Sequence, residues 1–147
     1  MRKPVLALAA LVAAGAAYAA AKPETVIHYR QSVFHIIVWN FRPLSDMAKG
    51  TTPYDAKEAA LRAQRIAASS EQLLEGFADG SDKGAETEAK PEIWQNRVDF
   101  ESKLHDLTTQ ANALYTVTQG GDATKFKAQF DKLKDSCKSC HDKYKAE

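Results

Sequence analysis

The chain has 147 residues, of which 44% are hydrophobic and 27% are charged. This length is sufficient for one domain with a hydrophobic core of its own. The 20 lysines and arginines nearly balance the 19 aspartates and glutamates, and no block of basic residues stands out. This charge pattern argues against a protein that binds nucleic acid.

The first residues follow the order of a secretory signal peptide. Positive charge in MRK precedes the apolar run VLALAALVAAG and the small residues AYAAA, an order that a buried N-terminal helix does not explain. We expect cleavage after Ala19 or Ala21, which assigns residues 1–21 to the signal and 22–147 to one exported domain. No apolar run is long enough to span a bilayer, so the mature protein should not insert into the membrane. We expect it in a bacterial periplasm.

Apolar residues recur at helical spacing through the rest of the chain, whereas the alternation typical of strands is scarce. Four helices are predicted, over about residues 23–47, 53–78, 92–119 and 123–145. Pro23 suits the start of the first helix, and Pro43 is expected to kink that helix or to end it early. Thr52 is a candidate N-cap for the second helix, with Pro53 as its first residue.

The connections between these helices differ in length. The polar stretch DGSDKGAETEAKP separates the second helix from the third, and we expect it to be a long exposed linker. Gly120 and Gly121 end the third helix, and Asp122 can cap the fourth. Four amphipathic helices with mostly short connections predict an all-α fold, an antiparallel up-down-up-down four-helix bundle.

The motif CKSCH near the end of the chain contains its only two cysteines, Cys137 and Cys140, followed directly by His141. Residues three and four apart share one face of a helix, so both thiols and the imidazole should face the bundle interior. This spacing is the attachment pattern of a c-type haem. Each thiol can form a thioether with a vinyl group, and the histidine can coordinate the iron. The motif therefore predicts one covalent haem c.

Other interpretations of two close cysteines are weaker. A zinc site needs about four ligands, and only His28, His35 and His105 could supplement the thiols, at spacings that match no usual finger. A structural disulfide here would close a very small loop. A thiol-disulfide enzyme normally places such a pair at a helix N-terminus, which lowers the thiol pKa, whereas this pair lies near a C-terminus. A haem-free thiol-disulfide protein remains as an alternative.

Several segments together resemble the cytochromes c′ over essentially the whole mature chain. They are KPETVIHYRQSVF, KGTTPYDA, KPEIW and CKSCHDKY. The resemblance implies a four-helix bundle with one covalent haem near one end and a five-coordinate, high-spin iron. It also implies a frequent homodimer built from the first two helices. Tyr29, Ile36 and Trp39 lie away from the inward stripe of the first helix, so either another helix or a second subunit covers them. The resemblance favours the second subunit.

The resemblance places Phe34 at the distal position, where a bulky apolar side chain covers the open face of the iron. Phenylalanine cannot ligate iron and donates no conventional hydrogen bond. Bound O₂ gains more from such a donor than NO or CO does, so we expect NO and CO binding with poor O₂ retention. We also expect Phe34 to slow ligand entry. Without the resemblance, Phe34 is better explained as an ordinary core aromatic.

A second protein ligand would make the iron six-coordinate and low-spin, as in an electron carrier. His28 and His35 lie about 100–120° around the helix from Phe34, and a flank or an interface explains them better. Met47 is expected at a helix end, and His105 on the surface.

Three further residues are candidates for contact with the haem. Arg30 lies one turn before Phe34, and a haem propionate would pair with it, although a solvated or protein-paired arginine is the alternative. Trp94 begins the third helix and packs either near the haem edge or in the plain core. Lys145 stands where the family usually has arginine, four residues after His141. Lysine keeps the charge and loses the planar fork, which leaves open whether NO ends on the proximal side.

The resulting prediction is a periplasmic haem protein that binds NO and CO, in nitric oxide buffering or detoxification, in electron transfer, or in both. No catalytic acid or base is evident, and we expect no more than a weak peroxidase or NO-reducing side activity. The redox partner is not identified by the sequence. The alternatives are a six-coordinate low-spin electron carrier and the haem-free thiol-disulfide protein.

Overall fold

A computed structural model describes residues 21–146. The predicted signal peptide lies outside these residues, apart from Ala21. The elements are α1 (Pro23–Lys49), α2 (Ala56–Ser70), the 3₁₀ helix η1 (Leu73–Phe77), α3 (Glu92–Gln95), α4 (Arg97–Thr118) and α5 (Ala123–Tyr144). No helix in this part of the chain is long and apolar enough to cross a membrane.

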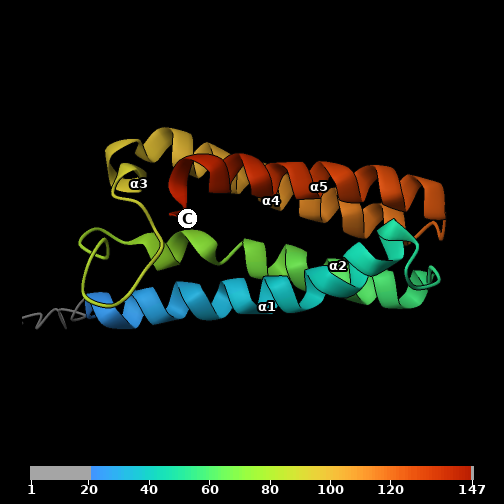
Figure 1. Ribbon diagram of the computed structural model, residues 1–147, viewed down its shortest axis with the longest axis horizontal. Coiled ribbons are helices and arrows are strands. Elements are labelled where there is room, and N and C mark those ends of the chain that lie inside the picture. The colour runs from blue at the N-terminus through green and yellow to red at the C-terminus, as the bar shows by residue number, and fades with distance from the viewer. Residues whose placement is uncertain (1–20, 147) are drawn as a thin grey trace, which may run out of the picture.

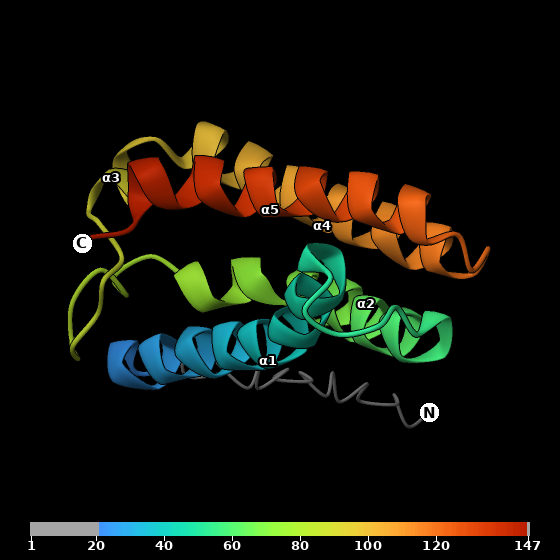
Figure 2. The same cartoon turned by 45° about the vertical axis from the view of Figure 1, so that its right-hand side comes forward.

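The four long helices form the predicted up-down-up-down bundle. α1 packs beside α2, α4 packs beside α5, and α2 joins the two pairs through α4 (Figure 1). The view in Figure 2 shows the same two layers. α1 and α5 approach each other much less closely than the other neighbouring helices do. The all-α prediction is confirmed, and the space between α1 and α5 is where the site lies.

Helix α1 is longer than expected at its C-terminal end. Pro23 occupies its first turn, and the helix continues through Pro43 to Lys49, so it does not end early at the proline. Gly50 terminates it with φ 77°, a conformation that glycine adopts without steric cost. Its N–H donates to the carbonyls of Asp46 and Met47.

Helix α2 begins later and ends sooner than predicted. Its N-cap is Asp55, whose side chain accepts the Glu58 N–H at 2.9 Å, so the assignment to Thr52 was wrong. The helix ends at Ser70, and the chain tightens into η1. Within η1, Gly76 lies directly against Arg30 of α1, and a Cβ on Gly76 would overlap the Arg30 side chain. Only a residue without a Cβ fits this close approach of η1 to α1.

The predicted third helix is divided in two. Asn96, between α3 and α4, has φ −119° and ψ 48°, which is not helical. Its side-chain amide donates to the Glu92 carbonyl at 3.2 Å, a local bond that competes with the helical ladder. The result is a short α3 that turns the chain at the end of the bundle.

The segment between η1 and α3 is only partly an exposed linker. Ser81 is 1% exposed, and the segment folds against the end of the bundle where α1 begins and α5 ends (Figure 1). The prediction of a long exposed linker was therefore wrong. The polar composition of the segment gives no sign of its contacts with residues distant in the sequence.

Candidate functional site

Helix α5 turns the two cysteines of the CKSCH motif toward the bundle interior, whereas His141 is exposed and lines the cavity, so the expectation that the imidazole faces the interior was wrong. Asp122 fixes the start of this helix, because its carboxylate accepts the Thr124 and Lys125 N–H groups at 2.9 and 3.0 Å. Cys137 and Cys140 are half-buried and pack against the hydrophobic core. The helix therefore presents both thiols on its inward side, as the spacing predicted.

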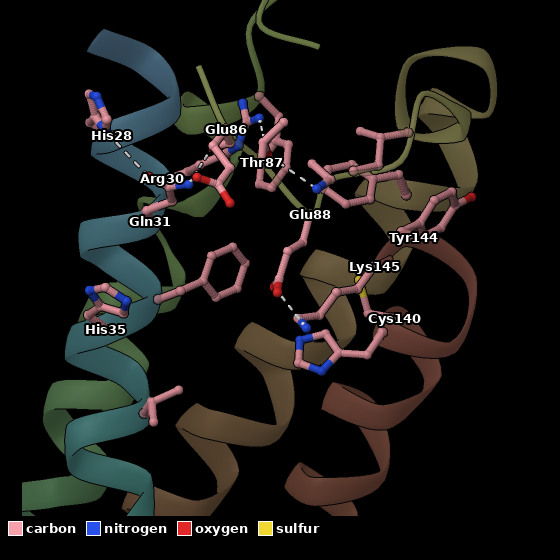
Figure 3. Close-up of a pocket in the computed structure, with 17 residues that line it drawn as sticks. His28, Arg30, Gln31, His35, Glu86, Thr87, Glu88, Cys140, Tyr144 and Lys145 are labelled. Atoms are coloured by element: carbon pink, nitrogen blue, oxygen red, sulfur yellow. Dashed lines mark hydrogen bonds and ion pairs between the residues drawn. The ribbon is translucent and has the colours of Figure 1, made fainter. Parts of the chain in front are cut away.

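A cavity of about 700 Å³ opens between α1, η1 and the C-terminal end of α5 (Figure 3). This volume lies within the roughly 300–1,000 Å³ that is typical of ligand and cofactor pockets. Aromatic and aliphatic side chains form much of its wall: Phe34, Phe77, Ile93 and Phe100. Cys140 and His141 line it from α5, whereas Cys137 lies behind the wall in the core. An apolar slot lined by one thiol and an imidazole of α5, with the second thiol one turn earlier on the same helix, fits a haem joined to α5.

The protonation states of the motif agree with this chemistry. Burial raises the pKa of both cysteine thiols to about 11, so neither is an activated thiolate at neutral pH. Burial, and next the charge of Lys145, lower the pKa of His141, which favours the neutral imidazole that a metal requires. The described residues contain no group of three or more His, Cys, Asp or Glu that could hold a metal ion. Neither the thiol-disulfide nor the zinc alternative gains support.

Arg30 is buried, with 2% of its surface exposed, and its partners are neutral rather than anionic. Nη1 donates to Gly76 O at 3.0 Å, Ser81 O at 2.9 Å and Ser81 Oγ at 3.1 Å, and Nη2 donates to Thr87 Oγ1 at 2.9 Å. The guanidinium also lies 5.0 Å from the centroid of the Phe77 ring. Burial lowers the pKa of Arg30, an effect that Asp82 partly offsets. Among the described residues, Arg30 is therefore paired with protein groups, as the alternative interpretation expected.

Arg30 nevertheless keeps hydrogen-bonding capacity beyond these contacts. A guanidinium has five N–H donors, and the contacts to protein account for both donors of Nη1 and one of Nη2. Arg30 lines the cavity, so pairing with a haem propionate stays a prediction.

The remaining candidates divide between the cavity and the core. Phe34 is half-buried, lines the cavity and meets Phe77 edge-on at a centroid distance of 6.3 Å. Lys145 also lines it, with Nζ 2.8 Å from the Glu88 carboxylate. Trp94 is not among the lining residues, and its Nε1 donates to the Ala78 carbonyl at 3.1 Å. These contacts favour plain packing for Trp94.

His28 and His35 are exposed, as expected of flank residues, but both lie at the rim of the cavity. Figure 3 shows them on α1, across the cavity from Cys140 and Lys145. Sequence reasoning did not anticipate this position.

Residues 86–89 and Tyr144 line the same cavity, and sequence reasoning gave none of them a role at the site. Tyr144 belongs to the apolar stripe of α5 and is 2% exposed, so its inward direction was readable from the helical spacing. No sequence signal marks residues 86–89, because their polar composition is typical of a linker.

Comparison with known proteins assigns this architecture. The sequence profile described as cytochrome c′ matches residues 25–145. The chain belongs to the cytochrome c′ family. A cytochrome c′ of Rubrivivax gelatinosus is 36% identical over 124 residues, covering 84% of this chain and 96% of that protein. The solved cytochrome c′ of Shewanella frigidimarina is 41% identical, with a TM-score of 0.82, covering 86% of this chain and 98% of the other.

Membership of the cytochrome c′ family establishes the cofactor as one covalent haem c, which the cysteines of the CKSCH motif attach. Cytochromes c′ are themselves standard examples of up-down-up-down bundles, in agreement with the fold described above. A solved nitric oxide complex of a cytochrome c′ variant from Alcaligenes xylosoxidans is 31% identical, with a TM-score of 0.80, covering 86% of this chain and 98% of that one.

Proposed function

We propose that this protein binds NO and CO at a five-coordinate haem, with His141 as the axial ligand and Phe34 covering the opposite face. The observation that carries the proposal is the position of Phe34 on α1, in the wall of the cavity that Cys140 and His141 line from α5. The haem, when bound, supplies an iron with an open coordination position for a diatomic gas.

The protein side chains determine which ligands this position favours. Phe34, Phe77 and Phe100 form an apolar part of the cavity wall, and their rings offer no conventional hydrogen-bond donor. Such a wall disfavours O₂ relative to NO and CO, because bound O₂ gains most from a donor. The nitric oxide complex of the Alcaligenes xylosoxidans relative supports NO as a ligand of this fold.

The biological role that follows is binding rather than catalysis. We infer nitric oxide buffering or detoxification, electron transfer, or both, in the periplasm, to which residues 1–21 direct the chain. A weak peroxidase or NO-reducing side activity is compatible with an open iron. Lys145 lines the cavity and forms an ion pair with Glu88. Because this lysine stands four residues after His141, its charge bears on whether NO binds on the His141 side.

We infer a homodimer through α1 and α2. Trp39 is 68% exposed and Ile36 is 50% exposed on α1, and Leu61 is exposed on α2. Exposed large apolar side chains on adjacent helices are typical of an interface. A solved cytochrome c′ that is 30% identical, with a TM-score of 0.82, is described as showing a ligand-controlled dimer dissociation.

A six-coordinate electron carrier is the second candidate, and the position of His35 at the cavity rim favours it. Absorption spectra of the reduced protein, recorded with and without NO, separate the two functions. We expect a high-spin spectrum that changes on addition of NO. A low-spin spectrum before any gas is added, which becomes high-spin in His35→Ala, would establish the carrier instead.

A further inference from the structure

The polar segment before α3 pairs with the end of the chain. Residues 86–90 and residues 144–146 run antiparallel beside the cavity, and we call these two pieces together the strap. Its backbone contacts are the bridge between Ala89 and Lys145, Lys90 N–H to Tyr144 O (3.0 Å) and Ala146 N–H to Glu88 O (2.7 Å). One ion pair accompanies them, with Lys145 Nζ 2.8 Å from Glu88 Oε2 (Figure 3).

The other edge of the strap is fastened to α1. Arg30 Nη2 donates to Thr87 Oγ1 at 2.9 Å, and Gln31 Nε2 donates to Glu86 O at 2.9 Å. The strap therefore reaches from α1 to α5 across the cavity. Glu88, Ala89 and Lys145 line that cavity together with His141.

The two edges of the strap differ in strength. The α1 edge includes a charge-assisted hydrogen bond from Arg30, a side chain that is 2% exposed. At the α5 edge the Lys145 and Glu88 side chains are 45% and 66% exposed. An exposed ion pair shifts an opening equilibrium by only about 1.5- to 5-fold.

We propose that the strap is a gate over the cavity that Phe34 and His141 both line, and that it opens at the α5 edge while Arg30 holds the α1 edge closed. Local opening draws on the contacts with the least burial, which at the α5 edge are those of Lys145 and Glu88. The effect of the gate on the entry of gas rests on the proposed function. The opening of the strap does not depend on that function.

Amide hydrogen exchange of the haem-loaded protein tests the opening. In Glu88→Gln the amides of Lys90 and Ala146 should exchange about 1.5- to 5-fold faster than in the parent. The amide of Asn96, which donates to Glu92 O at 2.9 Å, should not change. Asp131→Asn is the matched control, because it removes another exposed ion pair of 2.8 Å, that with Lys134 on α5. Unchanged exchange in Glu88→Gln, or an equal change in the control, overturns the proposal.

Ala146→Pro tests the backbone contact with the ion pair left in place. Proline has no N–H and removes the bond to Glu88 O, whereas Ala146→Ser keeps it. We expect faster exchange at Lys90 in the proline variant only. Equal exchange in the two variants would show that the α5 edge is not where the strap opens.

The association rate of CO tests the gate itself. Glu88→Gln and Ala146→Pro should both raise this rate by the same factor as they raise amide exchange, and Asp131→Asn should not. Faster exchange with an unchanged CO rate would overturn the gating role. A protein that binds no CO would overturn the proposed function, and the exchange experiment would still decide whether the strap opens.

Discussion

Arg30 on α1 donates a 2.9 Å hydrogen bond to Thr87 Oγ1, 57 residues further along the chain. The same guanidinium donates to the carbonyls of Gly76 and Ser81. One buried cation thus fixes both η1 and the polar segment that follows it. These two pieces form a large part of the cavity wall, so the shape of the site depends on Arg30.

Replacement of Arg30 should therefore cost stability. Arg30→Met leaves buried acceptors at Gly76, Ser81 and Thr87 without their donor, and we expect the free energy of unfolding to fall by about 3 kcal/mol. Arg30→Lys keeps the charge without the fork, and about half of that loss is expected. Urea denaturation of the haem-loaded protein measures both. Arg42→Met, at an exposed position of α1, serves as the control, and an equally small effect of Arg30→Met would contradict this role.

Gly76→Ala should destabilise the contact between η1 and α1. The added Cβ would overlap the Arg30 side chain, and overpacking of this kind costs about 1–3 kcal/mol. Gly120→Ala is the matched control, because its new Cβ would meet nothing closer than 3.5 Å and its φ is not positive. Thermal unfolding compares the two variants. Equal unfolding temperatures of the two variants would mean that the close approach of Gly76 to Arg30 does not limit stability.

The helices could be predicted from the sequence wherever local signals decide their ends. Gly121 and Asp122 set the start of α5. The stripe of apolar residues along this helix predicted its end within one residue of the observed end at Tyr144. The close packing of η1 against α1 could not be predicted, because it rests on the contact of Gly76 with Arg30 on another helix. Local propensity gives no sign of such a distant contact.

The site could be predicted in its covalent part. Cys140 and His141 line the cavity, and Cys137 does not, although the spacing places all three on one side of the helix. Its outer wall could not, since residues 86–89 are placed by Arg30, Gln31 and the chain end rather than by their own pattern.

Phe34→Ala should speed the entry of gas. If movement of the ring limits access, its removal should raise the CO association rate about tenfold, which corresponds to a barrier lower by about 1.4 kcal/mol. Flash photolysis of the reduced CO complex measures this rate. Phe126→Leu, in the core near Tyr54, provides a control that truncates a buried aromatic elsewhere. An unchanged rate in Phe34→Ala would place the entry route away from this residue.

Asp122 should make the stability of the bundle depend on acid pH. The Lys125 N–H, followed by the Thr124 N–H, lowers the pKa of this carboxylate relative to its usual value. A depressed pKa stabilises the folded state fully above the unfolded pKa of about 3.9, and the contribution disappears as the pH falls through the folded value. Asp122→Asn keeps a capping side chain that does not titrate. The stability advantage of the parent over this variant should shrink between about pH 5 and pH 2 in urea titrations; a constant difference would contradict the assignment.

The coordination state of the iron in the purified protein, before any gas is added, tests the central claim most directly. Electron paramagnetic resonance of the oxidised protein, with its intact mass recorded in parallel, is the measurement. The account predicts the added mass of one covalent haem and a high-spin signal from an iron with His141 as its only protein ligand. A low-spin signal from an iron bound by the protein on both faces, or a mass without haem, would contradict it.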